Sequence, residues 1–251
     1  LALAARDQRQ LDAVVFVLSK HTVDKEVVTG ACLVDRLLVL DRQSRSATGL
    51  GVVVVNRGLY VDQATILRRL FPDLDELTML VGFDKIVQIL DSKYYDDRDT
   101  AVAQLCSLAT LTVAPRGTAG RAELDELLAR PENARFRTCV STIDLPSQLR
   151  DLASSLSRAA LQGGNITLPE LPTAAQEFVR ETGCYQPPVR LSCGDLVDPY
   201  ALRVSVIEAL GRRRLTMNQL PRVSAIVRRA LVDDAPGRAL RAALADGHLP
   251  D

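Results

Sequence analysis

The sequence predicts an α/β protein with an open parallel sheet and a helical C-terminal appendage. Three observations carry this prediction: apolar runs without strict alternation, helical patterns between these runs, and an Arg- and Ala-rich end that contains helical patterns only. Strands buried on both faces are continuously apolar, and strands that alternate with helices favour parallel pairing through right-handed crossovers. The first two observations therefore predict the sheet, and the third predicts the appendage.

Apolar runs rich in β-branched residues mark the predicted strands. Four of them have the character of buried strands, and they span residues 13–18, 51–55, 77–81 and 108–113. A weaker strand is predicted at residues 135–140. Between the strands, apolar residues at helical spacing predict helices at residues 32–43, 61–70, 97–107 and 121–130.

The second half of the chain is predicted to be mainly helical. Helices are expected at residues 154–162 and 173–182, and a Pro-containing linker follows them. Asp198 and Pro199 fit a helix start, because Asp is a good cap and Pro suits the first turn. Three short helices complete the chain, at residues 199–213, 221–232 and 236–246.

Length and charge limit the classes of protein to consider. The chain has 251 residues, of which 47% are hydrophobic, and this fits one folded domain with an extension. We assign residues 1–185 to the main domain and residues 186–251 to the linker and the C-terminal helical extension. Basic and acidic residues both total 31, so no overall basic field indicates nucleic acid as a partner. No apolar run approaches the roughly 20 residues of a membrane span.

The five cysteines are odd in number, and no two of them form a C-x-x-C pair. This pattern argues against a zinc site and against a disulfide framework. We therefore predict buried, free thiols, no protein-bound metal, and the reducing cytoplasm as the location.

Polar residues at the ends of two predicted strands are the first candidates for a ligand site. Asp84 comes two residues after Gly82, at the end of the strand at 77–81, and Arg116 follows the strand at 108–113. Lys25 lies in the polar loop after the first strand. In parallel sheets, ligands bind in the crevice at the carboxyl ends of strands. The alternatives are that Asp84 caps the next helix and that Arg116 and Lys25 are solvated surface residues.

A second candidate is the start of the helix at 154–162. Ser154 and Ser155 offer hydroxyl groups and backbone N–H groups there, and Arg158 follows one turn later. Helix starts favour anions, and the guanidinium group binds phosphate well. Simple capping by one serine is the alternative interpretation. The chain contains neither G-x-G-x-x-G nor G-x-x-x-x-G-K-[ST], so the dinucleotide-binding Rossmann and P-loop classes lose their main support.

Taken in order, these segments resemble the nicotinate/nicotinamide mononucleotide adenylyltransferases of the nucleotidylyltransferase superfamily. Gly82, Phe83 and Asp84 look like the family's Gly-x-Asp motif, and Val113–Arg116 looks like its late arginine loop. Residues 153–158 look like its Ser-Ser-Thr-x-x-Arg motif, with Ala153, Ser154 and Ser155 at the three small positions. Further matches lie at Lys25, Asp35–Leu37, Leu171–Pro172 and Gly183–Tyr185, so that the likeness covers about residues 1–185.

The resemblance implies a Rossmann-like nucleotidylyltransferase fold and adenylyl transfer from ATP, as its Mg²⁺ complex, to a mononucleotide acceptor. Carried over residue by residue, it assigns Ser154, Ser155 and Arg158 to ATP. It assigns Gly82, Asp84, Lys25 and Arg116 to the acceptor side. The family's His-x-x-His or His-x-Gly-His loop does not occur in these residues, and we expect it upstream of Leu1.

Two other functions stay open. One is another nucleotidylyltransferase, of the cytidylyl or pantetheine-phosphate type, and the other is a degenerate, non-catalytic nucleotide-binding protein of the same fold. The role of residues 199–251 is also open, since they contain nine Arg and five acidic residues. They form either a packing or homo-oligomerisation element, or a basic element in which Arg212, Arg213 and Arg214 neutralise a phosphate or an acidic partner.

Overall fold

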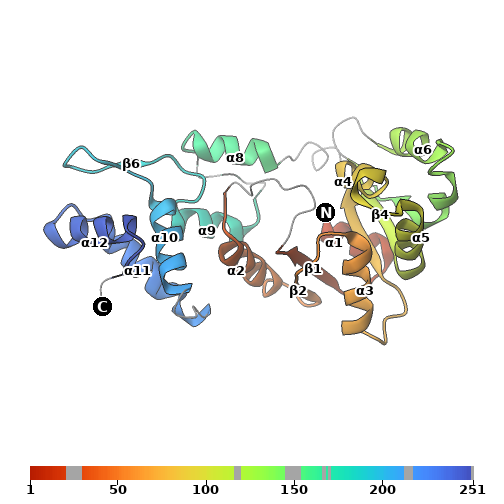
Figure 1. The fold of residues 1–251 in the computed structure, drawn as a ribbon, viewed down its shortest axis with the longest axis horizontal. Coiled ribbons are helices and arrows are strands. Elements are labelled where there is room, and N and C mark those ends of the chain that lie inside the picture. Colours follow the sequence, from red (N-terminus) through yellow and green to blue (C-terminus); the bar gives the residue numbers. More distant parts are fainter. Residues whose placement is uncertain are drawn as a thin grey trace. The chain divides into compact units, whose positions relative to one another are not determined.

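The computed structural model describes residues 1–20, 30–115, 120–144, 154–165, 168, 171–211 and 217–249. The chain divides into two compact units (Figure 1). Unit 1 consists of Leu1–Val27 and Ala47–Leu152, and unit 2 consists of Val28–Ser46 and Ala153–Asp251. The domain boundary expected between residues 185 and 186 stays a prediction.

Unit 1 contains two parallel sheets. In the first, β1 (Val14–Ser19) pairs with β2 (Leu50–Val55). The second has the strand order β3-β4-β5, and all three strands run parallel. Its strands are β3 (Thr78–Gly82), β4 (Thr110–Ala114) and β5 (Val140–Thr142). The predicted α/β class with open parallel strands is confirmed, although the described strands form two sheets rather than one continuous sheet.

Helices connect these strands, because a parallel pair needs a long crossover between its members. The α-helices of unit 1 are α1 (Ala2–Arg9), α3 (Tyr60–Leu70), α4 (Phe83–Ile89), α5 (Arg98–Leu108) and α6 (Arg121–Ala129). Two 3₁₀-helices accompany them, η1 (Ser92–Tyr94) and η2 (Ala134–Cys139). Asp97 caps α5 by accepting a hydrogen bond from the Thr100 N–H at 3.0 Å.

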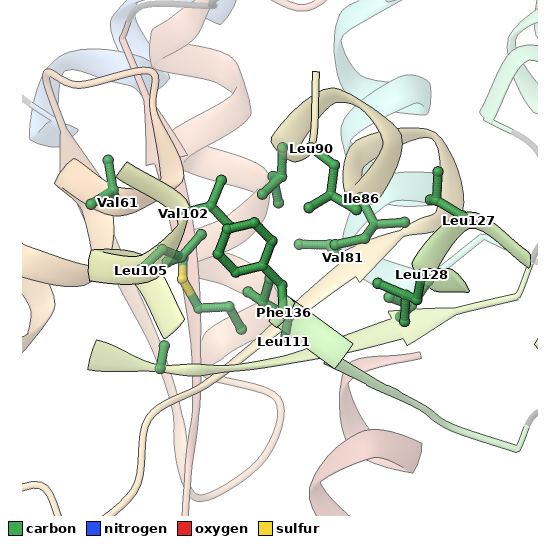
Figure 2. Close-up of a cluster of buried hydrophobic side chains, with 14 of the residues drawn as sticks. Val61, Val81, Ile86, Leu90, Val102, Leu105, Leu111, Leu127, Leu128 and Phe136 are labelled. Carbon is green, nitrogen blue, oxygen red and sulfur yellow. The ribbon is translucent and has the colours of Figure 1, made fainter. Parts of the chain in front are cut away.

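The main apolar core of unit 1 gathers around β3 and β4. Val81 and Leu111 come from these strands, Leu105 from α5 and Leu127 from α6. Figure 2 shows the ring of Phe136 among these side chains. Each fully buried Leu, Val or Phe stabilises the fold by about 1.5–3 kcal/mol relative to exposure. The core therefore holds the carboxyl ends of β3 and β4, where the first candidate site lies.

The strand predicted at residues 135–140 is wrong for most of its length. These residues form η2 up to Cys139, and only Val140 begins β5. Asn133 and Phe136 are buried and Cys139 is partly buried, while the residues between them are exposed. This spacing of three is the period of a 3₁₀-helix, and a strand would show a period of two.

The prediction that all cysteines are free is also wrong. Cys106 of α5 and Cys139 of η2 form a disulfide, with their Cα atoms 5.6 Å apart. Cys32, Cys184 and Cys193 are free; Cys184 is buried as expected, but Cys32 is only partly buried and Cys193 is exposed. The error arose because an odd count with no C-x-x-C spacing says nothing about a pair 33 residues apart. The cytoplasmic location stays a prediction.

Unit 2 is mainly helical. Its α-helices are α2 (Leu33–Ser44), α8 (Ser154–Gln162), α9 (Thr173–Thr182), α10 (Pro199–Gly211), α11 (Leu220–Ala230) and α12 (Ala235–Ala245). The predicted linker contains a short antiparallel hairpin of β6 (Val189–Arg190) and β7 (Leu196–Val197). Among the residues that the structure describes, no helix has both the length and the apolar character that a bilayer crossing requires.

Two apolar clusters hold unit 2 together. Val206, Val223 and Leu244 belong to the first, which joins α10, α11 and α12. Phe178 and Tyr200 belong to the second, which joins α9 and α10, and their rings meet edge to face with centroids 6.4 Å apart. The C-terminal helices thus pack on one another and on α9.

Gly237, in the first turn of α12, has no room for a side chain. A Cβ atom there would lie 2.0 Å from the carbonyl oxygen of Val232. We expect Gly237→Ala to lower the free energy of unfolding by about 1–3 kcal/mol, because the backbone must shift to relieve the overlap. Helix propensity alone predicts the opposite sign. Urea unfolding measures the change, and Gly211→Ala, which meets no atom within 4 Å, is the control.

Candidate functional site

The first candidate site lies at the carboxyl ends of β3 and β4 in unit 1. Gly82 ends β3 and stands in register with Ala114, which ends β4. Gly82 also caps α4, so Asp84 is not the cap but lies in the first turn of that helix, where it is exposed. Arg116 follows Ala114 by two positions, but Arg116 and Lys25 lie outside the described residues.

The space beside Gly82 is open. A Cβ atom on this residue would meet no atom within 4 Å, and its φ of −77° is available to any amino acid. The protein therefore does not need glycine here for its own packing. The absence of a side chain leaves the strand end accessible to a ligand.

A second candidate site lies on α8 in unit 2. Ser154 and Ser155 form the beginning of α8, and Arg158 stands one turn later, as predicted. Arg158 lines a hollow of about 760 Å³ together with Ala159 and Gln162 of the same helix. Pockets that hold small ligands usually measure roughly 300–1,000 Å³.

The remaining walls of this hollow come from three other segments of unit 2. Gly30 contributes from the segment before α2, and Tyr185 and Gln186 contribute from the segment after α9. The last wall comes from α10, which contributes Tyr200, Ala201, Val204 and Ser205, and from Asp198, the residue just before this helix. The lining combines a guanidinium group, a carboxylate, amides and two phenol rings.

The hydroxyl groups of the two lining tyrosines accept hydrogen bonds from backbone N–H groups at the amino-terminal end of α2. The Ala31 N–H donates to the Tyr185 hydroxyl at 3.2 Å, and the Cys32 N–H donates to the Tyr200 hydroxyl at 2.8 Å. These bonds fix the backbone at Cys32, the residue that precedes α2, and at Ala31 before it. Gly30 is required beside them, since its φ is +104° and a Cβ atom would lie 2.3 Å from the Tyr185 ring.

A buried ion pair connects α2 to α10. Asp35 and Arg203 are almost fully buried, and Arg203 donates to the Asp35 carboxylate through Nη2 at 2.6 Å and Nε at 2.9 Å. The Tyr200 hydroxyl donates to the same carboxylate at 3.1 Å. Arg203 Nη1 also donates to the Ser224 hydroxyl of α11 at 3.3 Å.

Burial and the neighbouring Asp35 shift the pKa values of the groups around this carboxylate. Burial opposes the charge of Arg203, but hydrogen bonds to Asp35 and its negative charge outweigh burial and raise the pKa of Arg203. Burial, supported by the charge of Asp35, raises the pKa of the Tyr200 hydroxyl. For the same reasons the pKa of the Cys184 thiol is raised to about 12. At neutral pH the Tyr200 hydroxyl therefore keeps its proton and donates a hydrogen bond to Asp35.

No cluster of three or more His, Cys, Asp or Glu side chains that could hold a metal ion occurs within the described part of the chain. His248 is exposed and lies near the C-terminal end, where its Nδ1 is 2.6 Å from the Asp246 carbonyl oxygen. His21 and the arginines at 212–214 lie outside the described residues.

Sequence reasoning missed the Asp35–Arg203 pair and the contribution of α10 to the hollow. A signal for the pair exists in each helix. Arg203 lies on the same helical stripe as Tyr200, Ile207 and Leu210, all of them buried. Asp35 follows Leu33 and Val34, and Arg36 separates it from Leu37. A charge on the inward face of a helix needs a buried partner, but local sequence does not identify that partner.

Comparison with known proteins extends these findings. No family model matches the chain. A protein of Citrifermentans bemidjiense named probable nicotinate-nucleotide adenylyltransferase is 26% identical over 198 residues, which cover 74% of this chain and 89% of that protein. A protein of Geobacter sp. strain M21 with the same name is 28% identical over 203 residues, with the same two coverages. The resemblance found in the sequence is thus confirmed as distant homology to nucleotidylyltransferases.

Proposed function

We propose that this chain, a distant homologue of proteins named probable nicotinate-nucleotide adenylyltransferase, transfers the adenylyl group of ATP to nicotinate or nicotinamide mononucleotide and releases pyrophosphate. The observation that carries the proposal is the homology over 74% of the chain. The open strand end at Gly82, beside the end of β4, agrees with it, because ligands of parallel sheets bind at such ends. The proposed location is the cytoplasm.

The proposed roles divide between two groups of residues. Ser154, Ser155 and Arg158 bind the phosphates of ATP, because helix-start N–H groups and a guanidinium group both favour anions. On the acceptor side, Gly82 allows close approach of the mononucleotide. Asp84 accepts hydrogen bonds from the mononucleotide, and Lys25 and Arg116 bind its phosphate. The roles of Lys25 and Arg116 are carried over from the family resemblance alone.

The proposed reaction is a direct in-line displacement. A phosphate oxygen of the mononucleotide attacks the α-phosphorus of ATP, a new P–O bond forms, and the bond to pyrophosphate breaks. The chain's residues contribute position and charge, which is how proteins mainly accelerate phosphoryl and nucleotidyl transfer. ATP enters as its Mg²⁺ complex, a form in which the phosphate oxygens of the substrate themselves hold the ion.

Turnover by the protein expressed from its full reading frame tests the proposal. We expect NAD from nicotinamide mononucleotide, or its deamido form from nicotinate mononucleotide, together with stoichiometric pyrophosphate. Turnover with CTP or with a pantetheine phosphate, but with neither mononucleotide, would assign the protein to another nucleotidylyltransferase type. Nucleotide binding without any turnover would identify a non-catalytic protein of the same fold.

Gly82 offers a clean test of the acceptor side, because its surroundings leave room for a side chain. We expect Gly82→Val to raise the KM for the mononucleotide about tenfold, as its methyl groups would occupy the space of the ligand. The KM for ATP and the melting temperature should change little. Gly211→Val, at another position with no atom within 4 Å, is the matched control. An unchanged mononucleotide KM in Gly82→Val would remove Gly82 from the site.

A further inference from the structure

The hollow lined by Arg158 has one wall that belongs to the C-terminal helical segment. We propose that this wall, formed by Asp198, Ala201 and Ser205 at the start of α10, contacts the nucleotide that Arg158 binds, and that Asp198 accepts hydrogen bonds from its ribose hydroxyls. The ligand class, an adenine nucleotide, rests on the proposed function. The assignment of α10 to the site rests on the geometry of unit 2.

The spacing of the lining residues gives this wall one continuous face. Positions 198, 201 and 205 are three and four residues apart, so they stand above one another on the helix surface. Arg158 and Gln162 have the same spacing on α8 and line the same hollow. One face of α8 and one face of α10 thus border the same hollow, although the two segments are about 40 residues apart in sequence.

The chemistry of the lining fits a nucleotide better than a simpler ligand. Arg158 supplies positive charge for phosphate, and the Asp198 carboxylate can accept hydrogen bonds from ribose hydroxyls. Gln162 provides an amide that can both donate to and accept from the edge of a base. Inorganic phosphate would leave most of the 760 Å³ unfilled.

Small side chains keep the hollow open on the side of α10. Ala201 is exposed at this wall, and Ser205 turns its hydroxyl back to the Ala201 carbonyl oxygen at 3.1 Å. Asp198 is oriented by its role as the helix cap, since its Oδ1 accepts from the N–H groups of Tyr200 at 2.8 Å and Ala201 at 3.1 Å. Its carboxylate therefore has a fixed direction before any ligand arrives.

Two buried residues of α10 anchor the wall, and one of them, Tyr200, also lines the hollow. Arg203 and Tyr200 both bond to Asp35 of α2, and Arg203 also bonds to α11. A side chain binds a ligand well when the residues around it hold it within a fraction of an ångström of its binding position. The buried pair thus makes Tyr200 and Arg203 positioning residues for the proposed wall.

Filling the hollow from α10 tests the proposal. Ala201→Trp should weaken ATP binding by tenfold or more, because the indole would occupy space that the nucleotide needs. Changes in the fit of a ligand to its pocket alter affinity on the order of 10–200-fold. Calorimetry measures the ATP affinity. Glu208→Trp is the matched control, since Glu208 is also exposed on α10 but does not line the hollow. Equal ATP affinity in the Ala201→Trp variant and the wild type, or equal weakening by both tryptophans, would overturn the proposal.

The ribose contact has its own readout. The wild type should bind ATP several-fold more tightly than 2′,3′-dideoxy-ATP, and Asp198→Ser should bind the two equally. Serine keeps a good helix cap, so α10 should still begin at the same residue. If Asp198→Ser still binds ATP more tightly than 2′,3′-dideoxy-ATP, Asp198 does not contact the ribose.

These binding experiments need no turnover, so the two proposals fail separately. A protein without adenylyl transfer, whose ATP affinity nevertheless falls in Ala201→Trp, would refute the proposed function and support the α10 wall. If adenylyl transfer is normal, and the ATP affinity and the KM for ATP are unchanged in Ala201→Trp, the proposed function is supported and the α10 wall is refuted. A folded wild type that binds no ATP would overturn the α10 wall.

Discussion

Replacing Asp35 with alanine is expected to lower the free energy of unfolding by about 3–5 kcal/mol, because the guanidinium group of Arg203 would stay buried without its counter-charge. Asp35 accepts four hydrogen bonds from three side chains: Arg203 donates two, and the Tyr200 hydroxyl and the Cys32 thiol donate one each. The carboxylate has no exposed surface, so water does not replace these bonds. Urea unfolding followed by circular dichroism measures the change, and hydrogen exchange should show faster opening of α2 and α10.

Asp41→Ala is the matched control for this prediction. Asp41 lies on the same helix, and its ion pair with Arg45 is largely exposed. Exposed pairs contribute only about 0–1 kcal/mol, so the control should unfold almost like the wild type. A loss below about 1 kcal/mol in Asp35→Ala would mean that the pair is not desolvated in solution.

A double substitution separates the cost of an unpaired charge from the value of the pair. Asp35→Leu combined with Arg203→Met removes both charges and keeps apolar volume between α2 and α10. We expect the double variant to be more stable than Asp35→Ala, because a buried pair often contributes little more than an apolar replacement. A double variant as unstable as the single one would instead assign the main stabilisation to the hydrogen bonds with Tyr200 and Ser224.

The sequence was informative where local pattern decides the structure. Apolar runs located β1 to β4, and helical spacing gave α8 and α9 their observed bounds. These features depend on neighbours a few residues apart, which a sequence displays directly. The same logic located Gly82 at the end of β3 and Arg158 one turn into α8.

Features that depend on distant residues could not be predicted in this way. Asp35 and Arg203 are 168 positions apart, and nothing local selects one arginine among many as the partner. The disulfide of Cys106 and the wall formed by Asp198, Ala201 and Ser205 are likewise products of tertiary packing. The short η2 helix was interpreted as a strand because its buried residue, Phe136, is also a strand former.

Arg158→Ala is expected to have the largest effect on nucleotide binding. A hydrogen bond to a charged group contributes about 1.5–3 kcal/mol, so loss of Arg158 should lower kcat/KM for ATP about 10- to 100-fold. Steady-state kinetics with ATP varied at saturating mononucleotide measure this, and calorimetry gives the loss in ATP affinity. The KM for the mononucleotide should change less than twofold, because Gly82 and Asp84 are assigned to that substrate.

Two further variants decide whether the effect belongs to the guanidinium group itself. Arg158→Lys keeps the positive charge but loses the planar fork, so it should recover only part of the ATP affinity. Arg222→Ala removes an exposed arginine of α11 in the same unit, and it should leave the kinetics unchanged. If Arg158→Ala and Arg222→Ala behave alike, the role of Arg158 is general surface charge. If ATP affinity falls only in Arg158→Ala and returns in part with lysine, Arg158 is a phosphate contact.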